Sequence, residues 1–198
     1  MLKICLLRHG QTSYNADGNK YCGRTDVGLT DLGVQQAEKM RDLLANRDFD
    51  AIFCSPLIRA RQTAEIASRG GQIVQTDPRL IEIDFGQWEG RRPEEFQVTD
   101  GQDWNSWLVD PFHNRAGGTG ESGAEVLERL SSFYNELLTT YDNKMVLVVG
   151  HNGINRFFMA SKLGMPLRNY RMLVQENSAL TELTLTANSG FNLLKLNA

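Results

Sequence analysis

The stretch that decides the fold is ICLLRHG, residues 4–10. Its apolar start is typical of a strand buried in a parallel sheet, and this strand ends at Arg8 and His9. Ligands of open α/β sheets bind at the carboxyl ends of the strands, so both side chains are expected where a ligand would lie. Arg8 can hold a phosphate or carboxylate, and His9 can act as a base or nucleophile near neutral pH. On its own, however, a histidine at such a place is more often a structural residue.

The chain beyond this strand alternates between helix and strand patterns. Residues 13–28 are polar and rich in Asn, Asp and Gly, which predicts a loop over the sheet edge. The following patterns predict a helix from Thr30 to about residue 46, a strand over 50–54, a helix over 57–69 and a strand at 73–74. Strands and helices in this order predict a parallel sheet flanked by helices.

The second half of the chain continues this alternation after a less regular segment. Residues 78–123 carry all three tryptophans with little periodicity, and we interpret them as a cap over the sheet edge with a short helix at 103–109. Beyond the cap we expect a helix over 121–141, a strand over 145–149, a helix over 154–163 and a hairpin of 181–186 with 191–196, turning at Asn188-Ser189-Gly190. The prediction is a single domain over 1–198 with a small cap insertion at about 87–120. Its fold class is α/β, a three-layer α/β/α sandwich with a mostly parallel sheet.

Composition argues against several classes of protein. The 198 residues carry a formal net charge of −3 without a long run of either sign, so binding to nucleic acid is not expected. No apolar segment approaches the roughly 20 residues that cross a membrane, and residues 1–7 are too short for a signal peptide. We therefore expect a cytoplasmic protein without membrane contact. Cys5, Cys22 and Cys54 form no C-x-x-C pair, which predicts buried free thiols without a disulfide or a zinc site.

Polar side chains also follow two of the other predicted strands. The strand over 145–149 is followed by His151, and the strand over 50–54 is followed by Arg59, just inside the next helix. If these strands are neighbours in one sheet, four side chains meet at one point: Arg8, His9, Arg59 and His151. Two guanidinium groups and a protonated imidazole would then face a dianion such as a phosphate monoester, whose charge is about −1.5 to −2 at neutral pH. The alternative, in which the arginines form surface ion pairs and the histidines lie in the core, does not explain why each follows an apolar run.

An ordered set of short motifs runs along nearly the whole chain. The motifs are LRHGQT (7–12) with Asn15, GRTD (23–26), LT (29–30) with Gly33, Gln36 and Ala37, SPL (55–57) with Arg59, Ala60, Thr63 and Ala64, Leu80 with Glu82, GQWEG (86–90), GES (120–122) and VGHNG (149–153). The RHG triplet alone would be weak evidence, but the ordered set is specific. It resembles the histidine phosphatase superfamily, also called phosphoglycerate mutase-like.

The resemblance implies a phosphohistidine mechanism on these positions. His9 would attack phosphorus while Arg8, Arg59 and His151 hold the phosphate oxygens. Glu82 matches the proton donor of the family, which protonates the leaving oxygen and later takes a proton from water. Further contacts to the phosphate or substrate are expected from Asn15, Gly23, Arg24 and Asn152. The reaction implied requires no metal and no cofactor.

Glu82 also has an ordinary interpretation, as an outward carboxylate of a short strand over 81–84. A proton donor needs a raised pKa, which the apolar neighbours of Glu82 would favour and the arginines would oppose. Asp84 is the alternative candidate for this role. His113 lies in the cap without a strand before it, and we expect it at the surface.

Three functions stay open at this point. The leading one is a metal-independent phosphomonoester hydrolase that acts on a small phosphorylated metabolite, such as α-ribazole phosphate or a sugar or glycerate phosphate. A cofactor-dependent phosphoglycerate mutase is the second, but the Tyr and Lys expected for it are replaced by Phe85 and Pro93. A non-catalytic phospho-ligand binding module is the third. Among phosphatases, the motifs resemble α-ribazole phosphatases, fructose-2,6-bisphosphatases and phosphoserine phosphatases alike.

Substrate choice and association are expected to depend on the loops and the last strand. Residues 13–26 and 87–120 would select the small-molecule phosphomonoester, and a second anionic group on it could be bound by Arg24, Arg91, Arg92 or Arg115. Residues 191–198 are apolar at alternate positions and could form an edge strand that pairs with a second copy in a homodimer.

Overall fold

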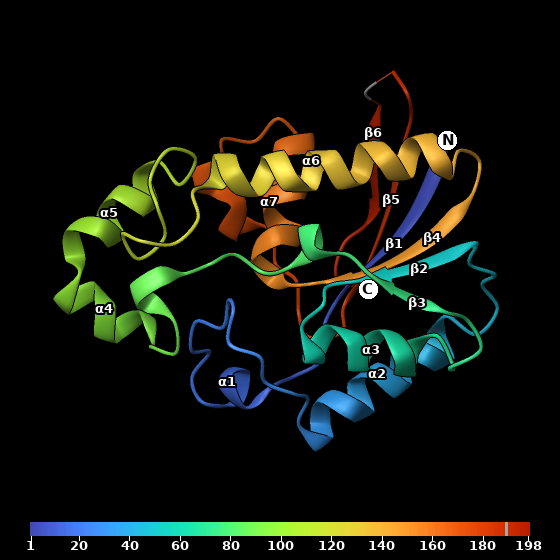
Figure 1. Ribbon diagram of the computed structural model, residues 1–198, viewed down its shortest axis with the longest axis horizontal. Coiled ribbons are helices and arrows are strands. Elements are labelled where there is room, and N and C mark those ends of the chain that lie inside the picture. The colour runs from blue at the N-terminus through green and yellow to red at the C-terminus, as the bar shows by residue number, and fades with distance from the viewer. Residues whose placement is uncertain (189) are drawn as a thin grey trace.

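A six-stranded sheet lies at the centre of the computed structural model, which describes residues 1–188 and 190–198 (Figure 1). Across the sheet the strands are β3 (Val74–Thr76), β2 (Ala51–Cys54), β4 (Met145–Gly150), β1 (Leu2–Arg8), β5 (Leu180–Leu185) and β6 (Phe191–Lys195). The first four are parallel to one another, and β5 and β6 add antiparallel pairs at one side. The expected mostly parallel sheet is therefore confirmed.

Helices cover both faces of this sheet. Figure 1 shows α6 (Gly123–Thr140) and α7 (Asn152–Lys162) on one side, and α2 (Asp31–Leu43) and α3 (Ile58–Ala67) on the other. Alternate residues of β1 serve the two layers, because side chains of a strand point to opposite faces in turn. Ile4 and Leu6 belong to one buried cluster, while Cys5 and Leu7 belong to the other. This confirms the predicted three-layer sandwich.

The N-terminus of α2 is capped as predicted, whereas that of α3 is capped by a residue that was not predicted to do so. Thr30 is the N-cap of α2, as predicted, and its side chain accepts a hydrogen bond from the backbone N–H of Gly33 at 3.1 Å. The N-cap residue of α3 is Leu57, whose side chain cannot accept a hydrogen bond from the helix. Instead, the Asp26 carboxylate accepts from the N–H of Ile58 at 2.7 Å, which fastens the preceding polar segment to this helix.

The segment predicted as a loop over 13–28 begins with a short helix, α1 (Ser13–Ala16), so that prediction is wrong in part. Thr12 and Asn15 form a reciprocal capping box around this single turn. A helix this short has no apolar periodicity, and only the capping pair could have indicated it. Three short 3₁₀ segments were also not predicted: η1 (Pro78–Leu80), η2 (Gly86–Trp88) and η3 (Leu167–Met172).

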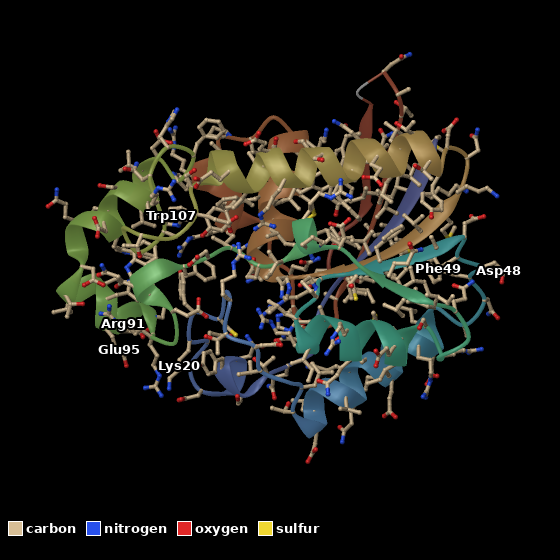
Figure 2. The ribbon with its side chains drawn as sticks, in the orientation of Figure 1. Lys20, Asp48, Phe49, Arg91, Glu95 and Trp107 are labelled. Carbon is tan, nitrogen blue, oxygen red and sulfur yellow. The ribbon has the colours of Figure 1, made fainter. Side chains whose placement is uncertain are left out.

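The cap contains two helices, α4 (Pro93–Thr99) and α5 (Gly101–Val109), of which only α5 was predicted. Both lie beyond one end of the sheet (Figure 1). Trp88 and Trp107 are fully buried, and Trp88 stacks on Phe96 with ring centroids 4.9 Å apart. Figure 2 shows Trp107 in this cap and Glu95 on its outside. The tryptophans thus pack the cap, because Trp104 and Trp107 of α5 and Trp88 of η2 bury their rings against one another and against Phe96 of α4.

The C-terminal strands pair as the predicted hairpin, although Ser189 of the predicted turn lies outside the described residues. β6 is an edge strand, and Leu194 on it is 58% exposed. Cys5 and Cys54 are buried free thiols as expected, whereas Cys22 is only partly buried. Within residues 1–188 and 190–198, no helix is long and apolar enough to span a membrane.

Candidate active site

The central strands bring His9 and His151 together at their carboxyl ends. β1 and β4 are adjacent and parallel, with Arg8 opposite Gly150, so the residue that follows each strand is the histidine. The His9 N–H donates to the Gly150 carbonyl at 3.0 Å, and the two imidazole centroids are 5.2 Å apart. The structure therefore brings the His9 and His151 side chains together, as the sequence predicted.

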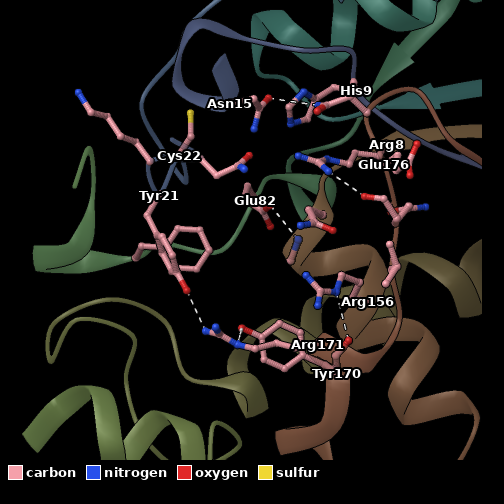
Figure 3. Close-up of a pocket in the computed structure, with 18 of the residues that line it drawn as sticks. Arg8, His9, Asn15, Tyr21, Cys22, Glu82, Arg156, Tyr170, Arg171 and Glu176 are labelled. Atoms are coloured by element: carbon pink, nitrogen blue, oxygen red, sulfur yellow. Dashed lines mark hydrogen bonds between the residues drawn. The ribbon is translucent and has the colours of Figure 1, made fainter. Parts of the chain in front are cut away.

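A pocket of about 750 Å³ opens at this sheet edge, a volume typical of small-molecule sites. Arg8, His9, Asn15, Glu82 and Asn152 all line it. Figure 3 shows His9 and Asn15 at one end, with Tyr170 and Arg171 at the other. Arg59 and His151 are fully buried behind the lining residues, with His151 against the His9 ring.

The protonation state of His9 follows from its backbone contact. Its Nδ1 lies 2.7 Å from the Gly10 carbonyl oxygen, which can only accept, so Nδ1 carries the proton. Nε2 is then left with its lone pair, as a nucleophile requires. Burial first, and then the charges of Arg59 and Arg8, hold the pKa of His9 well below the ordinary value of 6.5, which keeps the ring neutral.

His151 is a hydrogen-bond donor without being charged. Arg59 Nε donates to His151 Nδ1 at 3.2 Å, so Nδ1 is the acceptor and the ring proton lies on Nε2. That buried Nε2 has no partner among the described residues. Burial, followed by the charges of Arg59 and His9, lowers the pKa of His151 well below 6.5. These contacts favour a neutral imidazole instead of the predicted protonated one, and a neutral Nε2–H can donate to a phosphate oxygen.

Arg59 connects His151 to the loop over residues 22–25. Its Nη1 donates to the Thr25 carbonyl at 2.8 Å, and its Nη2 donates to the carbonyls of Cys22 and Gly23 at 3.1 and 2.8 Å. With the bond to His151, four of the five guanidinium donors are used within the protein. Arg59 thus supplies positive charge and holds residues 22–25 in place.

Arg8 is less tied by hydrogen bonds. Its Nη1 donates to the Gln175 carbonyl at 2.7 Å, while its buried Nε has no partner in the described part of the chain. Burial lowers the pKa of Arg8 to about 10, which still leaves it charged at neutral pH. A pocket wall with unpaired guanidinium donors favours an anionic ligand.

Glu82 lies against the N-terminus of α7, and it is not part of a strand. Oε1 accepts from the N–H groups of Ile83 and Ile154, each at 3.0 Å, and Oε2 accepts from that of Gly153 at 2.9 Å. Since a carboxylate offers about four lone-pair positions, one on Oε2 is free to carry a proton. Burial raises the pKa of Glu82, and the three N–H groups and Arg59 oppose that rise.

Asp84, the alternative proton donor, does not line this pocket. Its Oδ1 accepts instead from the N–H of Gly86 at 2.8 Å. His113 is exposed and pairs with Asp110 at 2.7 Å, at the surface as expected. Of the two candidates for the proton donor, only Glu82 therefore lines the pocket together with His9.

The residues predicted as further substrate contacts fall into two groups. Asn15 and Asn152 line the pocket, while Gly23 and Arg24 do not. Arg24 is paired with Glu121 at 3.0 Å, and the N–H of Gly23 donates to the Glu89 carboxylate at 2.8 Å. Glu89 also accepts from the next two N–H groups along the chain. Glu89 and Glu121 thus hold the loop over residues 23–25 in place. Both lie far from this loop in the sequence, so no local sequence pattern indicates these contacts.

The arginines suggested for a second anionic group are also occupied. Arg91 pairs with Asp100, and Arg92 and Arg115 pair with Asp17 and Glu125. The pocket instead contains Arg156 and Arg171, which sequence reasoning missed. Arg156 had a signal: it follows Asn152 by four residues on a helix, so both share one face. Arg171 lies in η3, where no periodic pattern marks it.

Metal ligands are not grouped in the described part of the chain. In residues 1–188 and 190–198, no three His, Cys, Asp or Glu side chains come together in a way that could hold a metal ion.

Gly153 leaves the space that the Glu82 carboxylate occupies. A Cβ built there would lie 2.6 Å from Glu82 Oε1 and 2.8 Å from Ile83 Cδ1. Gly153→Ala should therefore lower the free energy of unfolding by about 1–3 kcal/mol through overpacking and should displace the carboxylate. Gly101→Ala is the control, because a Cβ there meets nothing within 4 Å. Urea unfolding measures both variants, and equal stabilities would contradict the described contact.

Comparison with known proteins agrees with this geometry. The family model of the histidine phosphatase superfamily (branch 1) matches residues 4–198. The adenosylcobalamin/alpha-ribazole phosphatase of Escherichia coli (strain K12) is 32% identical over 166 residues, which are 83% of this chain and 81% of that protein. Phosphoserine phosphatase 1 of Hydrogenobacter thermophilus is 34% identical over 171 residues, 86% of this chain and 80% of that one.

Solved structures give the same result. The crystal structure of phosphoserine phosphatase from Entamoeba histolytica with 3-phosphoglyceric acid has a TM-score of 0.90 at 29% identity, covering 100% of this chain and 98% of that one. A putative alpha-ribazole-5'-P phosphatase from Escherichia coli has a TM-score of 0.87 at 29% identity, covering 100% and 96%. The chain belongs to the histidine phosphatase superfamily, branch 1, and it is a phosphatase enzyme.

Proposed function

We propose that this phosphatase hydrolyses the phosphomonoester of a small metabolite through a phosphohistidine on His9, without a metal ion. The observation that carries the proposal is the hydrogen bond from His9 Nδ1 to the Gly10 carbonyl, which leaves Nε2 as the reactive nitrogen. Arg8 and Glu82 line the same pocket. A nucleophile, a cation and a proton donor therefore share one space of suitable size.

The proposed reaction has two balanced steps. In the first, His9 Nε2 attacks phosphorus, the P–O bond to the leaving group breaks, and the leaving oxygen takes the proton from Glu82 Oε2. In the second, water loses a proton to Glu82 and attacks phosphorus, and the P–N bond breaks to release phosphate and neutral His9. Arg8, Arg59 and the Nε2–H of His151 are proposed to stabilise charge on the transferring oxygens.

Names of the relatives support a small substrate. They refer to α-ribazole phosphate, phosphoserine and glucosyl-3-phosphoglycerate, each a phosphorylated metabolite. A pocket of about 750 Å³ suits molecules of this size. We propose a phosphorylated metabolite of this size as the substrate.

The test is trapping of the phosphoenzyme. The protein is incubated with p-nitrophenyl phosphate and a chelator, quenched in base, and digested, because a P–N bond survives base and is cleaved by acid. We expect steady phosphate release and one phosphorylated peptide, containing residue 9. Phosphate on another residue, or activity lost with the chelator, would contradict the proposal. Isomerisation of phosphoglycerate without phosphate release would indicate a mutase instead.

A further inference from the structure

The arginines of this chain divide by whether a carboxylate neutralises them. Many of them have acidic partners, such as Asp100 for Arg91 and Glu121 for Arg24, while exposed Arg168 has none among the described residues but is surrounded by solvent. Among the described residues, four arginines at the pocket form no ion pair: Arg8, Arg59, Arg156 and Arg171. The phosphate site proposed above accounts for the first two. Arg156 and Arg171 are a second pair of uncompensated charges along the same pocket.

Both side chains are held in place by neutral groups. Arg156 Nε donates to the Tyr170 carbonyl at 3.1 Å, and its guanidinium lies 5.1 Å from the centre of the Tyr170 ring. Arg171 donates from Nε to the Tyr170 hydroxyl at 3.1 Å and from Nη2 to the Tyr21 hydroxyl at 2.8 Å. None of these partners cancels the charge. Arg156 keeps both Nη groups, and Arg171 its Nη1, without a described partner in the protein.

Neither acidic side chain of the pocket forms an ion pair with Arg156 or Arg171 among the described residues. Glu82 is bonded to three backbone N–H groups, and Glu176 is exposed without an ion pair among the described residues. Two guanidinium groups close to one another repel, and the partial burial of Arg156, which lowers its pKa, adds a desolvation cost. An anion between them would relieve both costs.

We propose that Arg156 and Arg171 form a second anion subsite, which binds a carboxylate or phosphate on the same substrate molecule that places its phosphomonoester at His9. This inference rests on the proposed function and narrows its substrate class to phosphomonoesters with a second anionic group. Figure 3 shows the two arginines at the end of the pocket away from His9. A substrate that spans the pocket reaches both ends.

Tyr21 positions Arg171 in this subsite. Its ring lies in the aromatic cluster of the cap, 4.6 Å from Phe85 and 5.0 Å from Phe96 between centroids, and its hydroxyl accepts from Arg171. Tyr21→Phe keeps the ring and removes only that hydrogen bond. We expect this variant to weaken binding of the second anion less than loss of Arg171 does.

The experiment measures binding to the His9→Ala protein, in which turnover does not interfere. Calorimetry compares two matched pairs of ligands: 3-phosphoglycerate with glycerol 3-phosphate, and fructose 1,6-bisphosphate with fructose 6-phosphate. The first pair differs in a carboxylate, the second in a phosphate. We expect Kd to be lower by about 10- to 100-fold for the doubly anionic member of at least one pair, and that pair identifies the group.

The same comparison in Arg156→Gln and Arg171→Gln tests the residues. Each should reduce the ratio of the two Kd values to below about 3-fold. Arg168→Gln is the matched control for Arg171→Gln, since it removes the same charge from the same 3₁₀ segment at an exposed position outside this pocket, and it should keep the ratio. A merely structural role of the arginines would weaken both ligands of a pair equally.

Two results would overturn the subsite: ratios near 1 for both pairs, or ratios that survive both substitutions. If His9→Ala does not fold, the corresponding ratios of kcat/KM in proteins that retain His9 decide the same question. Failure of the wild-type protein to hydrolyse any of the four compounds, with the ratios of Kd intact, would contradict the proposed hydrolysis and leave the subsite standing.

Discussion

His9→Ala is expected to lower kcat/KM for p-nitrophenyl phosphate by at least about 10⁴-fold, the scale of loss found when a nucleophile is removed. Arg8, Arg59 and His151 remain to hold the phosphate, but no group is left to form the P–N bond. The fold should survive, because β1 keeps its backbone pairing and the side chain loses only its bond to the Gly10 carbonyl. Steady-state kinetics and thermal unfolding measure the two effects.

The control for this substitution is His113, the histidine in the cap. His113 is exposed and contacts Asp110, far from the chemistry proposed for His9. His113→Ala should retain the wild-type kcat/KM. A His9→Ala protein with more than about a tenth of wild-type activity would eliminate His9 as the nucleophile.

Glu82→Gln is expected to lower kcat/KM for an alkyl phosphate such as glycerol 3-phosphate by about 10²- to 10⁴-fold, the usual contribution of a general acid. An alkoxide is a poor leaving group and needs the proton, whereas p-nitrophenolate leaves without one. The loss in kcat/KM for p-nitrophenyl phosphate should therefore be much smaller. Its kcat should still fall, because Glu82 also takes the proton from water in the second step.

The pH profile gives an independent test of Glu82. It must be protonated to donate, and burial raises its pKa, so donation persists to higher pH than for an exposed carboxyl group. We expect kcat/KM for glycerol 3-phosphate to fall as pH rises through that pKa, and this limb should be absent in Glu82→Gln. The second ionisation of the substrate, near pH 6, is common to both proteins. Two results would show that another group donates the proton. One is an equal loss of kcat/KM for glycerol 3-phosphate and p-nitrophenyl phosphate in Glu82→Gln, and the other is a pH profile of Glu82→Gln that still falls at high pH.

The sheet and the side chains at its ligand edge could be predicted because their signals are local. Buried strands appear as apolar runs, and the first polar residue after each run lies at the ligand edge. This placed Arg8, His9 and His151 from sequence alone, and Arg59 followed from its position at the start of the next helix. Side chains of a strand point to opposite faces at every second residue, so the division of the β1 side chains between the two buried clusters could also be predicted.

The remaining features depend on contacts between distant residues. α4 has no apolar periodicity over its few residues, and its start depends on Pro93 and on the hydrogen bond that the N–H of Arg92 donates to the Glu95 carboxylate. The neutral state of His151 depends on which of its nitrogens meets Arg59, which no pattern of residue types encodes. Likewise, the sequence contains many arginines, and only the tertiary structure separates those paired with carboxylates from Arg156 and Arg171.

The pairing of Arg8 with Gly150 also limits how this enzyme can be changed. A residue inserted into β1 or β4 would advance the attached imidazole by about 3.3 Å and turn it to the opposite face of the sheet. Even a single insertion there should abolish turnover. The cap helices α4 and α5, by contrast, lie outside the sheet and take no part in its strand register. Lengthening α4 or α5 should therefore leave the register of β1 with β4, and with it the placement of His9 and His151, unchanged.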